Sequence, residues 1–293
     1  MSSDPRQAID TIVVDGLALA NEIRKELSEA VGRHVAAGRR PPKLAVVLVG
    51  DDPASASYIK GKRRACERIG MDSLEERLLA TASQADVLAV VARLNGDVSV
   101  DGILVQLPLP AGLDPNAVAE ALDPEKDVDG LHPVSAGRLL LGLPGLTPCT
   151  PLGIMAILER YHVPLAGSSA VVIGRSNIVG KPISLLLQRA NATVTMCHSR
   201  TRDLRERCLG ADVLVAAAGV PRLVKRDWVK PGAAVIDVGV SEVDGVLTGD
   251  VDTEAVQGVA RLVTPHRRGV GPMTITMLLR NTLAAYEARS GAR

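Results

Sequence analysis

Two doubly wound α/β domains with a cleft between them are the fold that this sequence predicts. Aliphatic runs suited to buried parallel strands alternate with segments of helical periodicity along most of the chain. The 293 residues are enough for two domains, each with its own core. Residues 123–150 interrupt the alternation with a stretch rich in Pro, Gly and Asp, which we interpret as a functional loop and linker. We therefore expect one domain at 1–150, a second at 151–271, and a C-terminal helix, 272–293, that packs back on the first.

The first domain is expected to alternate strand and helix from its start. Ile12 to Val14 is a short apolar run, and Asp15 stands where the N-cap of the next helix belongs. Gly38 stops that helix. Further strands are expected at 43–49, 74–79 and 101–106, and further helices at 54–69, 85–94 and 115–122.

The second domain is expected to continue the same alternation. A helix over 151–161 leads into it, and the last helix runs from Pro272 to Arg289. Strands are expected near 169–173, 192–197, 212–217 and 233–238, and helices near 180–190, 201–209 and 252–258.

The composition argues against several classes of protein. A net charge of +1 and an aromatic content of 1% give no support for nucleic-acid binding through basic patches or base stacking. No apolar run reaches the ~18 residues that span a membrane, and Met1 to Pro5 shows no signal-peptide pattern. The four cysteines, Cys66, Cys149, Cys197 and Cys208, are widely spaced, which is typical of reduced, buried thiols. We expect a cytoplasmic protein.

The stretch from Val171 to Pro182 has the pattern of a strand, a tight turn and a helix. A β-branched run ends at Gly174, a polar turn follows, and Gly180 precedes a helical pattern. Such a turn aims backbone N–H groups and the positive end of a helix dipole at one point, which suits a phosphate. Compared with the dinucleotide fingerprint G-x-G-x-x-G, Ser176 replaces the middle glycine and one extra residue precedes Gly180. The alternative is a tight turn that only brings a helix close to a strand.

Cationic residues near the next strand end favour NADP over NAD as the cofactor of a Rossmann-like domain. In an NAD site an Asp or Glu at this point would bind the ribose 2′-hydroxyl. Here the strand is followed by His198-Ser199-Arg200, and Arg175 lies in the glycine turn, so an extra phosphate is favoured. The alternative is that Arg200 is a solvated surface residue. Small residues at two later strand ends, 216–219 and 237–240, would let a cofactor approach closely.

Ser55, Tyr58 and Lys62 share one face of a predicted helix that follows a buried strand. Their spacing of i, i+3 and i+7 places them together where a cleft is expected. Gln106 ends a second buried strand, and Asp129 lies in the aperiodic loop Lys126-Asp127-Val128-Asp129-Gly130. A lysine in a partly dry cleft beside an amide can have its pKa lowered toward neutrality and act as an acid or a base. The alternative is an exposed Tyr–Lys pair without function.

Other candidate sites have simpler explanations. His132 has no second His or Cys at metal-ligand spacing, so we expect a loop histidine and no bound metal. Asp250 and Asp252 flank a short segment, and we expect them to cap the helix that follows.

Several motifs in register resemble one family over almost the whole chain. They are Gly50-Asp51-Asp52-Pro53-Ala54-Ser55 with Tyr58 and Lys62, Val105-Gln106-Leu107-Pro108-Leu109-Pro110, Lys126-Asp127-Val128-Asp129-Gly130, Pro148-Cys149-Thr150-Pro151, Gly174-Arg175-Ser176 with Val179-Gly180, His198-Ser199, and Gly269-Val270-Gly271-Pro272-Met273-Thr274. The chain thus resembles the bifunctional methylenetetrahydrofolate dehydrogenase/methenyltetrahydrofolate cyclohydrolase family. The resemblance implies NADP-dependent oxidation of methylenetetrahydrofolate to methenyltetrahydrofolate, and hydrolysis of the latter to formyltetrahydrofolate in one-carbon metabolism and purine biosynthesis. It also implies a homodimer that pairs through the cofactor domain.

The same resemblance implies roles for individual residues. Lys62 would activate, or relay a proton to, the water that attacks the methenyl carbon, and Gln106 would hold Lys62 and tune its protonation. Tyr58 would line the folate site, and Asp129 would hydrogen-bond the pterin edge. Further substrate contacts would come from Ser55, Gly271 and Pro272, and the NADP contacts from Gly174, Arg175, Ser176, Ser199 and Val240, beside Arg200.

One segment departs from the family's pattern. Where the family usually reads Thr-Pro-Val-Pro-Gly-Gly-Val, this chain reads Thr264-Pro265-His266-Arg267-Arg268-Gly269-Val270. Three large residues should not follow the path of a Pro-Gly turn. The segment is then a tolerated loop variant, a place where Arg267 and Arg268 reach anionic groups of folate or cofactor, or the mark of a paralogue with one activity weakened. Two further alternatives are an NADP dehydrogenase for a small acid and a non-catalytic module that binds folate or NADP.

Overall fold

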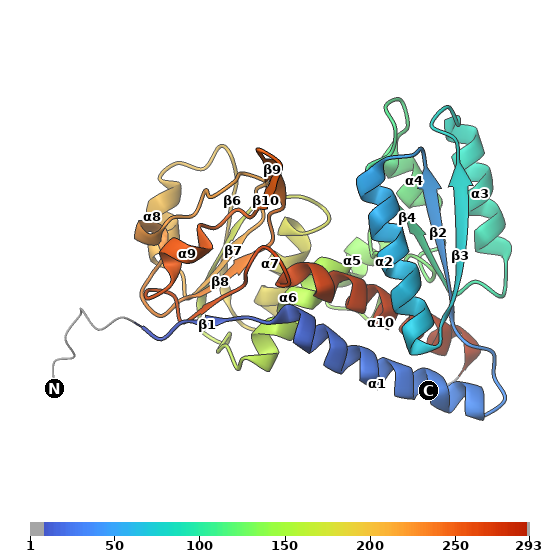
Figure 1. Cartoon of the computed structure of the whole chain (residues 1–293), viewed down its shortest axis with the longest axis horizontal. Helices are drawn as coiled ribbons and strands as arrows, with labels where there is room; N and C mark the ends of the chain where they lie inside the picture. The colour runs from blue at the N-terminus through green and yellow to red at the C-terminus, as the bar shows by residue number, and fades with distance from the viewer. Residues whose placement is uncertain (1–8, 292–293) are drawn as a thin grey trace. The chain divides into compact units, whose positions relative to one another are not determined.

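The computed structural model describes residues 9–291 and, within them, all side chains except those of residues 53–57. Met1 to Pro5, where the sequence shows no signal peptide, lies outside the described residues. The chain divides into two compact units, whose elements are labelled in Figure 1. We call residues 20–149 and 275–291 the lysine unit, because they include Lys62, and residues 9–19 and 150–274 the glycine-turn unit, because they include Gly174.

The lysine unit is built on a three-stranded parallel sheet. Its strands are β2 (Lys43–Val49), β3 (Asp72–Leu78) and β4 (Gly102–Val105), in the order β3-β2-β4. The central strand β2 is buried from Leu44 onward, as its continuous aliphatic run predicts for a strand covered on both faces. The outer strand β3 is only partly buried, which agrees with its more polar sequence.

Helices cover both faces of this sheet. Val47 faces α3 (Gln84–Gly96) and α4 (Pro115–Ala121), which contribute Val91 and Val118 to the same core. Val46, the preceding residue of β2, points to the opposite face, where it meets Ile59 of α2 (Pro53–Ile69). The arrangement is the doubly wound one that the alternating sequence predicts.

The glycine-turn unit has a six-stranded sheet in which all neighbouring strands are parallel. Its strands are β1 (Ile12–Val13), β5 (Ser169–Ile173), β6 (Thr193–Cys197), β7 (Val213–Ala216), β8 (Ala234–Asp237) and β11 (Leu262–Val263), in the order β6-β5-β7-β8-β11-β1. The chain moves outward from β5 to β6 and then returns past β5 to β7. Right-handed crossovers in opposite directions place the connecting helices α7 (Gly180–Arg189) and α8 (Leu204–Leu209) on opposite faces.

The first strand belongs to a different unit from the one expected. Ile12 and Val13 pair in parallel with Leu262 and Val263, so the N-terminal strand extends the sheet of the glycine-turn unit and not that of the first domain. The long helix α1 (Gly16–Ala36) follows, and its residues from Ala20 onward group with the lysine unit. Strands that follow one another in the sequence usually lie side by side in a sheet. Here, however, the partner strand lies near the other end of the sequence.

The loop expected over residues 123–150 contains a helix that the sequence analysis did not predict. It is α5 (Pro133–Leu141), followed by the first turn of α6 (Cys149–Arg160). The side chain of His132 caps α5, and Gly142 ends it with a φ of 71°. Leu140 and Leu141 are exposed, so the helix lacks the regular apolar face that would have revealed it.

The remaining elements lie in the second half of the chain. They are the short 3-10 helix η1 (Arg226–Trp228), the hairpin of β9 (Ser241–Val243) and β10 (Val246–Thr248), α9 (Thr253–Val256) and the C-terminal helix α10 (Val270–Ser290). The hairpin was not predicted, although its Asp244-Gly245 turn, with both φ angles positive, is a recognisable signal. Within residues 9–291, no helix combines the length and the apolar character that a membrane span requires.

Candidate functional site

The lysine unit brings Lys62 and Gln106 into direct contact. Lys62 lies on α2 and is only 9% exposed, and Gln106 follows the last residue of β4. Nζ of Lys62 donates to Oε1 of Gln106 at 2.8 Å, and Nε2 of Gln106 donates to the Leu107 carbonyl at 2.6 Å. The second bond fixes the amide so that its oxygen, the only acceptor, faces the lysine.

A buried lysine anchors the loop that carries Asp129. The side chain of Lys126 is fully buried, and its Nζ donates to the carbonyl oxygens of Leu94, Asn95 and Asp97 at 3.1, 2.7 and 2.8 Å. These carbonyls end α3, where unpaired acceptors and the negative end of the helix dipole favour a cation. The loop is thereby fixed beside β4.

Two further contacts hold the same loop. The backbone N–H of Ile103 donates to the Lys126 carbonyl at 2.7 Å, so the loop continues the sheet beyond β4. Asn281 of α10 donates from Nδ2 to the carbonyls of Val128 and Thr147 at 2.8 and 2.9 Å. The backbone on either side of Asp129 is therefore fixed from several elements of the unit.

Asp129 and Cys149 provide the electrostatic surroundings of Lys62. Burial lowers the pKa of Lys62, and the charge of Asp129 opposes this shift. Burial likewise raises the pKa of Asp129, and Lys62 opposes that change. The pKa of the Cys149 thiol is raised by burial and by Asp129, so the thiol stays protonated and donates to the Val128 carbonyl at 3.2 Å. Lys62 is thus closer to its neutral form than an exposed lysine would be.

Asp127, two residues before Asp129, has a structural role. Its Oδ2 accepts hydrogen bonds from the backbone N–H of His132 at 2.7 Å and from the Ser135 hydroxyl at 3.2 Å. Burial raises its pKa to about 6. Nδ1 of His132 accepts from the Val134 N–H at 2.9 Å, so this histidine caps α5 and holds the loop shape.

Of the two other predicted folate contacts on α2, the structure describes the side chain of only one. Tyr58 is 50% exposed and lies one turn before Lys62. Ser55 lies in the first turn of α2, but its side chain is outside the described residues. The site in this unit therefore consists of a buried Lys62 bonded to a half-buried Gln106, a half-buried Asp129, and an exposed tyrosine.

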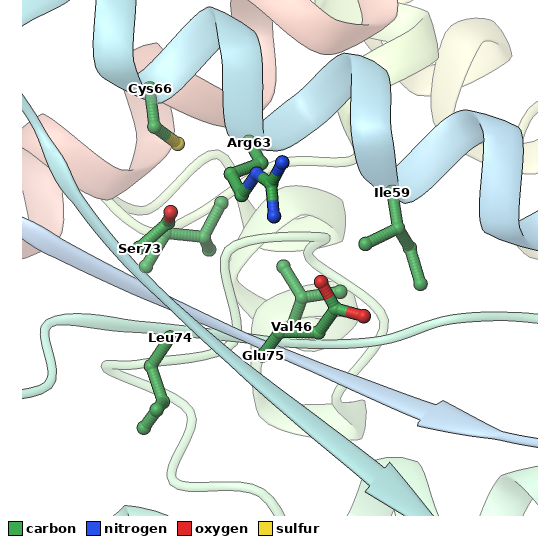
Figure 2. A pocket seen from close by; sticks show the side chains of 8 residues that line it. Val46, Ile59, Arg63, Cys66, Ser73, Leu74 and Glu75 are labelled. Atoms are coloured by element: carbon green, nitrogen blue, oxygen red, sulfur yellow. The ribbon is translucent and has the colours of Figure 1, made fainter.

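A cavity of about 190 Å³ under α2 is separate from this site. Figure 2 shows Ile59, Arg63 and Cys66 extending from the helix toward Ser73 and Glu75 on β3. Neither Lys62 nor Gln106 lines it. Half of its lining residues are aliphatic, and burial raises the pKa of the Cys66 thiol to about 12, so this thiol stays protonated at neutral pH.

The glycine turn of the other unit has two positions where a side chain does not fit. Gly174 has a φ of 130°, and a Cβ there would lie 2.1 Å from the carbonyl oxygen of Ala217. A Cβ on Gly180 would lie 2.3 Å from the carbonyl oxygen of Gly174. Oγ of Ser176 accepts from the N–H groups of Val179 and Gly180 at 3.2 and 3.3 Å. The hydroxyl thus closes the turn at the start of α7, where the fingerprint has a glycine.

The strand order places the predicted cofactor residues at one edge of the sheet. The order reverses between β5 and β7, and ligands of open α/β sheets bind at the carboxyl ends of strands next to such a reversal. Gly174 to Ser176 follow β5, Ser199 and Arg200 follow β6, and Val240 follows β8. Because all these strands are parallel, the three segments meet at the same edge. Arg175, Ser199, Arg200 and Val240 are all exposed there.

The divergent loop adopts a backbone that glycine would adopt easily. Arg268 has a φ of 64°, in the left-handed region that a residue with a side chain rarely adopts. Its Nη2 lies 3.1 Å from Oδ2 of Asp15, and its carbonyl accepts from the Leu17 N–H at 3.1 Å. The Ala18 N–H first, and Arg268 after it, lower the pKa of Asp15. Gly271 and Pro272 follow in the first turn of α10.

Two acidic residues near α9 differ in role. Asp252 caps α9 by accepting from the Ala255 N–H at 3.3 Å, as expected. Asp250 does not cap a helix, because its Oδ2 accepts from the N–H groups of Ala218 and Gly219 at 2.6 and 2.9 Å. The sequence predicts no site role for Cys149, Lys126 or Asn281. Only the motif context of Lys126 and Cys149 signalled them, since a buried lysine or amide leaves no periodic pattern.

Comparison with known proteins matches both units to one family. The catalytic domain of tetrahydrofolate dehydrogenase/cyclohydrolase matches residues 14–129, and the NAD(P)-binding domain of the same family matches residues 148–290. The chain belongs to the tetrahydrofolate dehydrogenase/cyclohydrolase family. A relative from Desulfovibrio desulfuricans, named bifunctional protein FolD, is 52% identical over 283 residues, which cover 95% of this chain and 99% of that protein.

Solved structures of other family members have the same fold. The bifunctional enzyme FolD, methylenetetrahydrofolate dehydrogenase/cyclohydrolase, from Campylobacter jejuni matches with a TM-score of 0.93 and 45% identity, covering 95% of this chain and 99% of that one. The Trypanosoma brucei enzyme, solved with NADP and an inhibitor, matches with a TM-score of 0.91 and 38% identity, covering 96% and 98%. These matches confirm the predicted two-domain α/β fold and the family resemblance.

Proposed function

We propose that the protein is a bifunctional enzyme of folate one-carbon metabolism. It oxidises methylenetetrahydrofolate to methenyltetrahydrofolate with NADP and hydrolyses the product to formyltetrahydrofolate. The Campylobacter jejuni enzyme, whose name gives both activities, aligns with nearly the full chain. The observation that carries the proposal is the contact of the buried Lys62 with Gln106 beside Asp129, since a lysine with a lowered pKa held by an amide suits proton transfer.

Lys62 serves the hydrolytic step as a base. Its amine, with a pKa lowered by burial, takes a proton from the water whose oxygen attacks the methenyl carbon. A carbon–nitrogen bond of the methenyl bridge then breaks, the nitrogen receives a proton, and the formyl group remains on the other nitrogen. Gln106 orients Nζ through its fixed amide oxygen. Asp129 binds the polar edge of the pterin, and Tyr58, with Ser55, lines the folate site.

The carboxyl edge of the glycine-turn sheet fits NADP. Gly174 and Gly180 allow a tight turn in which a Cβ would clash with a carbonyl oxygen, and the positive end of the α7 dipole at this turn suits a pyrophosphate. Arg175, Ser199 and Arg200 are exposed beside it and suit a 2′-phosphate. When bound, the cofactor supplies the hydride acceptor of the dehydrogenase step. Val240, after β8, is a further proposed NADP contact, whereas Gly271 and Pro272, in the first turn of α10, are proposed substrate contacts.

We also propose a cytoplasmic homodimer that pairs through the glycine-turn unit. Strand β6 ends the sheet as an open edge with Met196 exposed, and such edges tend to be covered by a partner. The β9–β10 hairpin exposes Val243, Val246 and Leu247.

The four cysteines are free and buried, as suits a reducing compartment such as the cytoplasm. The formyl product serves reactions such as those of purine biosynthesis.

One experiment tests both activities. The protein is incubated with methylenetetrahydrofolate and NADP, and NADPH is followed together with the formation and decay of the methenyl product. We expect NADPH to appear and the methenyl signal to rise and then decay. No NADPH would contradict the dehydrogenase, and a stable methenyl signal would indicate a paralogue without cyclohydrolase activity. Stabilisation by NADP or folate without any turnover would indicate a binding module.

A further inference from the structure

A buried carboxylate connects two loops at the carboxyl edge of the glycine-turn sheet. Asp250 is fully buried, and its Oδ2 accepts from the N–H groups of Ala218 and Gly219, which belong to the loop after β7. Its Oδ1 lies against the loop after β8, since a Cβ on Gly239 would be 2.0 Å from this oxygen. Both loops lie at the edge where the cofactor residues meet.

Asp237, the last residue of β8, extends this network to a third strand. Its Oδ1 accepts from the N–H groups of Gly239 and Asp250 at 3.1 and 2.9 Å, and its Oδ2 accepts from Val251 at 3.2 Å. Its backbone N–H donates to the Thr264 hydroxyl, just after β11, at 2.7 Å. The two carboxyl groups therefore link the loops after β7 and β8, and the backbone N–H of Asp237 joins them to the end of β11.

We propose that Asp250 is a positioning residue for NADP, which fixes the loops after β7 and β8 in the conformation that the cofactor binds. The inference rests on the proposed NADP-dependent function. Val240, a proposed cofactor contact, directly follows Gly239, so a shift of this loop displaces it. The N–H groups of Ala218 and Gly219 bond to Asp250, so the carboxylate, and not a helix or a ladder, sets the turn of that loop.

The contacts of Asp250 are not those of a residue kept for stability alone. Its Oδ1 is buried without a hydrogen-bond partner among the described residues, and a carboxylate oxygen in that state costs free energy. Removing the side chain therefore removes two good hydrogen bonds and one unfavourable burial. We expect the loss in NADP affinity to exceed the loss in stability.

Asp250→Ala in the full chain tests this role. The dissociation constant for NADP should rise about tenfold or more, since two loop-ordering hydrogen bonds are lost. The kcat of dehydrogenation at saturating NADP should change much less than its Michaelis constant for NADP. Hydrolysis of supplied methenyltetrahydrofolate is the internal reference, because Lys62, Gln106 and Asp129 all belong to the lysine unit. Asp250→Asn keeps one oxygen that can accept both N–H groups, so its effect should be smaller.

Asp212→Asn is the matched control. Oδ2 of Asp212 accepts from the Ser169 N–H at 2.9 Å, at the opposite edge of the same sheet, and this variant should bind NADP like the wild type. Wild-type affinity in Asp250→Ala would overturn the proposal, as would equal losses in NADP affinity, hydrolysis and unfolding midpoint. If Asp250→Ala does not fold, Asp250→Asn and Gly239→Ala decide by the same criteria. A wild-type protein that does not bind NADP would instead overturn the proposed function.

Discussion

Nζ of Lys62 and Oε1 of Gln106 lie 2.8 Å apart, and the amide is held in this orientation by its own bond to the Leu107 carbonyl. The neutral amide accepts a hydrogen bond from the lysine in either protonation state, so it positions the amine without adding a charge that would raise its pKa. Burial then remains the main influence on Lys62 and lowers its pKa.

Gln106→Glu should move the pH dependence of hydrolysis. A carboxylate at 106 would favour the charged lysine, so the pH at which Lys62 becomes a base should rise by about one unit or more. The pH–rate profile of methenyl hydrolysis measures this shift. Gln84→Glu, a similar change on α3 whose amide oxygen binds the Asp114 N–H, should leave the profile in place. An unshifted profile in Gln106→Glu would mean that the 2.8 Å contact does not control Lys62.

Arg200→Ala should weaken NADP binding far more than NAD binding. The loss of a charged partner of the 2′-phosphate should raise the Michaelis constant for NADP about tenfold or more. The matched control is Arg202→Ala, two residues further along, where the side chain is also exposed but carries no predicted contact. Steady-state kinetics with both cofactors measures the difference. Equal effects of the two substitutions would leave Arg200 an ordinary surface residue.

The two arginines of the divergent loop should behave differently. Arg268 pairs with Asp15 on the surface and holds a left-handed backbone, so Arg268→Gly loses a weak ion pair and relieves strain. The unfolding temperature of Arg268→Gly should therefore stay close to that of the wild type, whereas Arg268→Val should lower it.

Arg267→Gly should raise the Michaelis constant for folate or NADP if this side chain contacts an anionic group. Unchanged constants in Arg267→Gly would make the segment a tolerated loop variant.

Asp237 should make stability depend on pH in the acid to neutral range. Burial raises its pKa to about 7, whereas the unfolded chain loses this proton near its ordinary value of ~4. Folding therefore takes up a proton between these values, and the free energy of unfolding falls as pH rises from about 4 to about 7. This contribution is complete below the lower value and absent above the upper one.

Denaturant unfolding at several pH values, compared between wild type and Asp237→Asn, measures this effect. The wild type should lose more stability than the variant between pH ~4 and ~7, by an amount on the order of 4 kcal/mol. Some dependence should remain in the variant, because the pKa of Asp127 is also raised, to about 6. Parallel curves for the two proteins would show that Asp237 is ionised in the folded state.

The elements that the sequence predicts well are those with strong local patterns. The aliphatic run of β2, the glycine turn at Gly174 and the Tyr58–Lys62 spacing each depend on residues a few positions apart. The glycine turn is an ambiguous signal in the sequence alone, and the steric contacts of Gly174 and Gly180 give a physical reason for both glycines. Ser176, which breaks the usual fingerprint, closes the turn with its hydroxyl.

The features that the sequence did not reveal depend on contacts between distant parts of the chain. Strand β1 pairs with Leu262 and Val263, and no local pattern encodes such a partner. Asp250 looks like a helix cap in sequence, but the fold turns it toward the loop after β7. Lys126 is charged and fully buried, against the usual preference, because three carbonyls at the end of α3 satisfy it.

Lys62→Met provides the most direct test of the central claim that Lys62 carries the hydrolytic step. Methionine keeps the length and the burial of the side chain but cannot accept a proton. Hydrolysis of methenyltetrahydrofolate by the purified variant is measured together with its NADP dissociation constant and its unfolding midpoint. The account predicts that hydrolysis is abolished while NADP binding is unchanged, since Lys62 and the cofactor edge belong to different units. Hydrolysis at the wild-type rate by a folded Lys62→Met protein would contradict it.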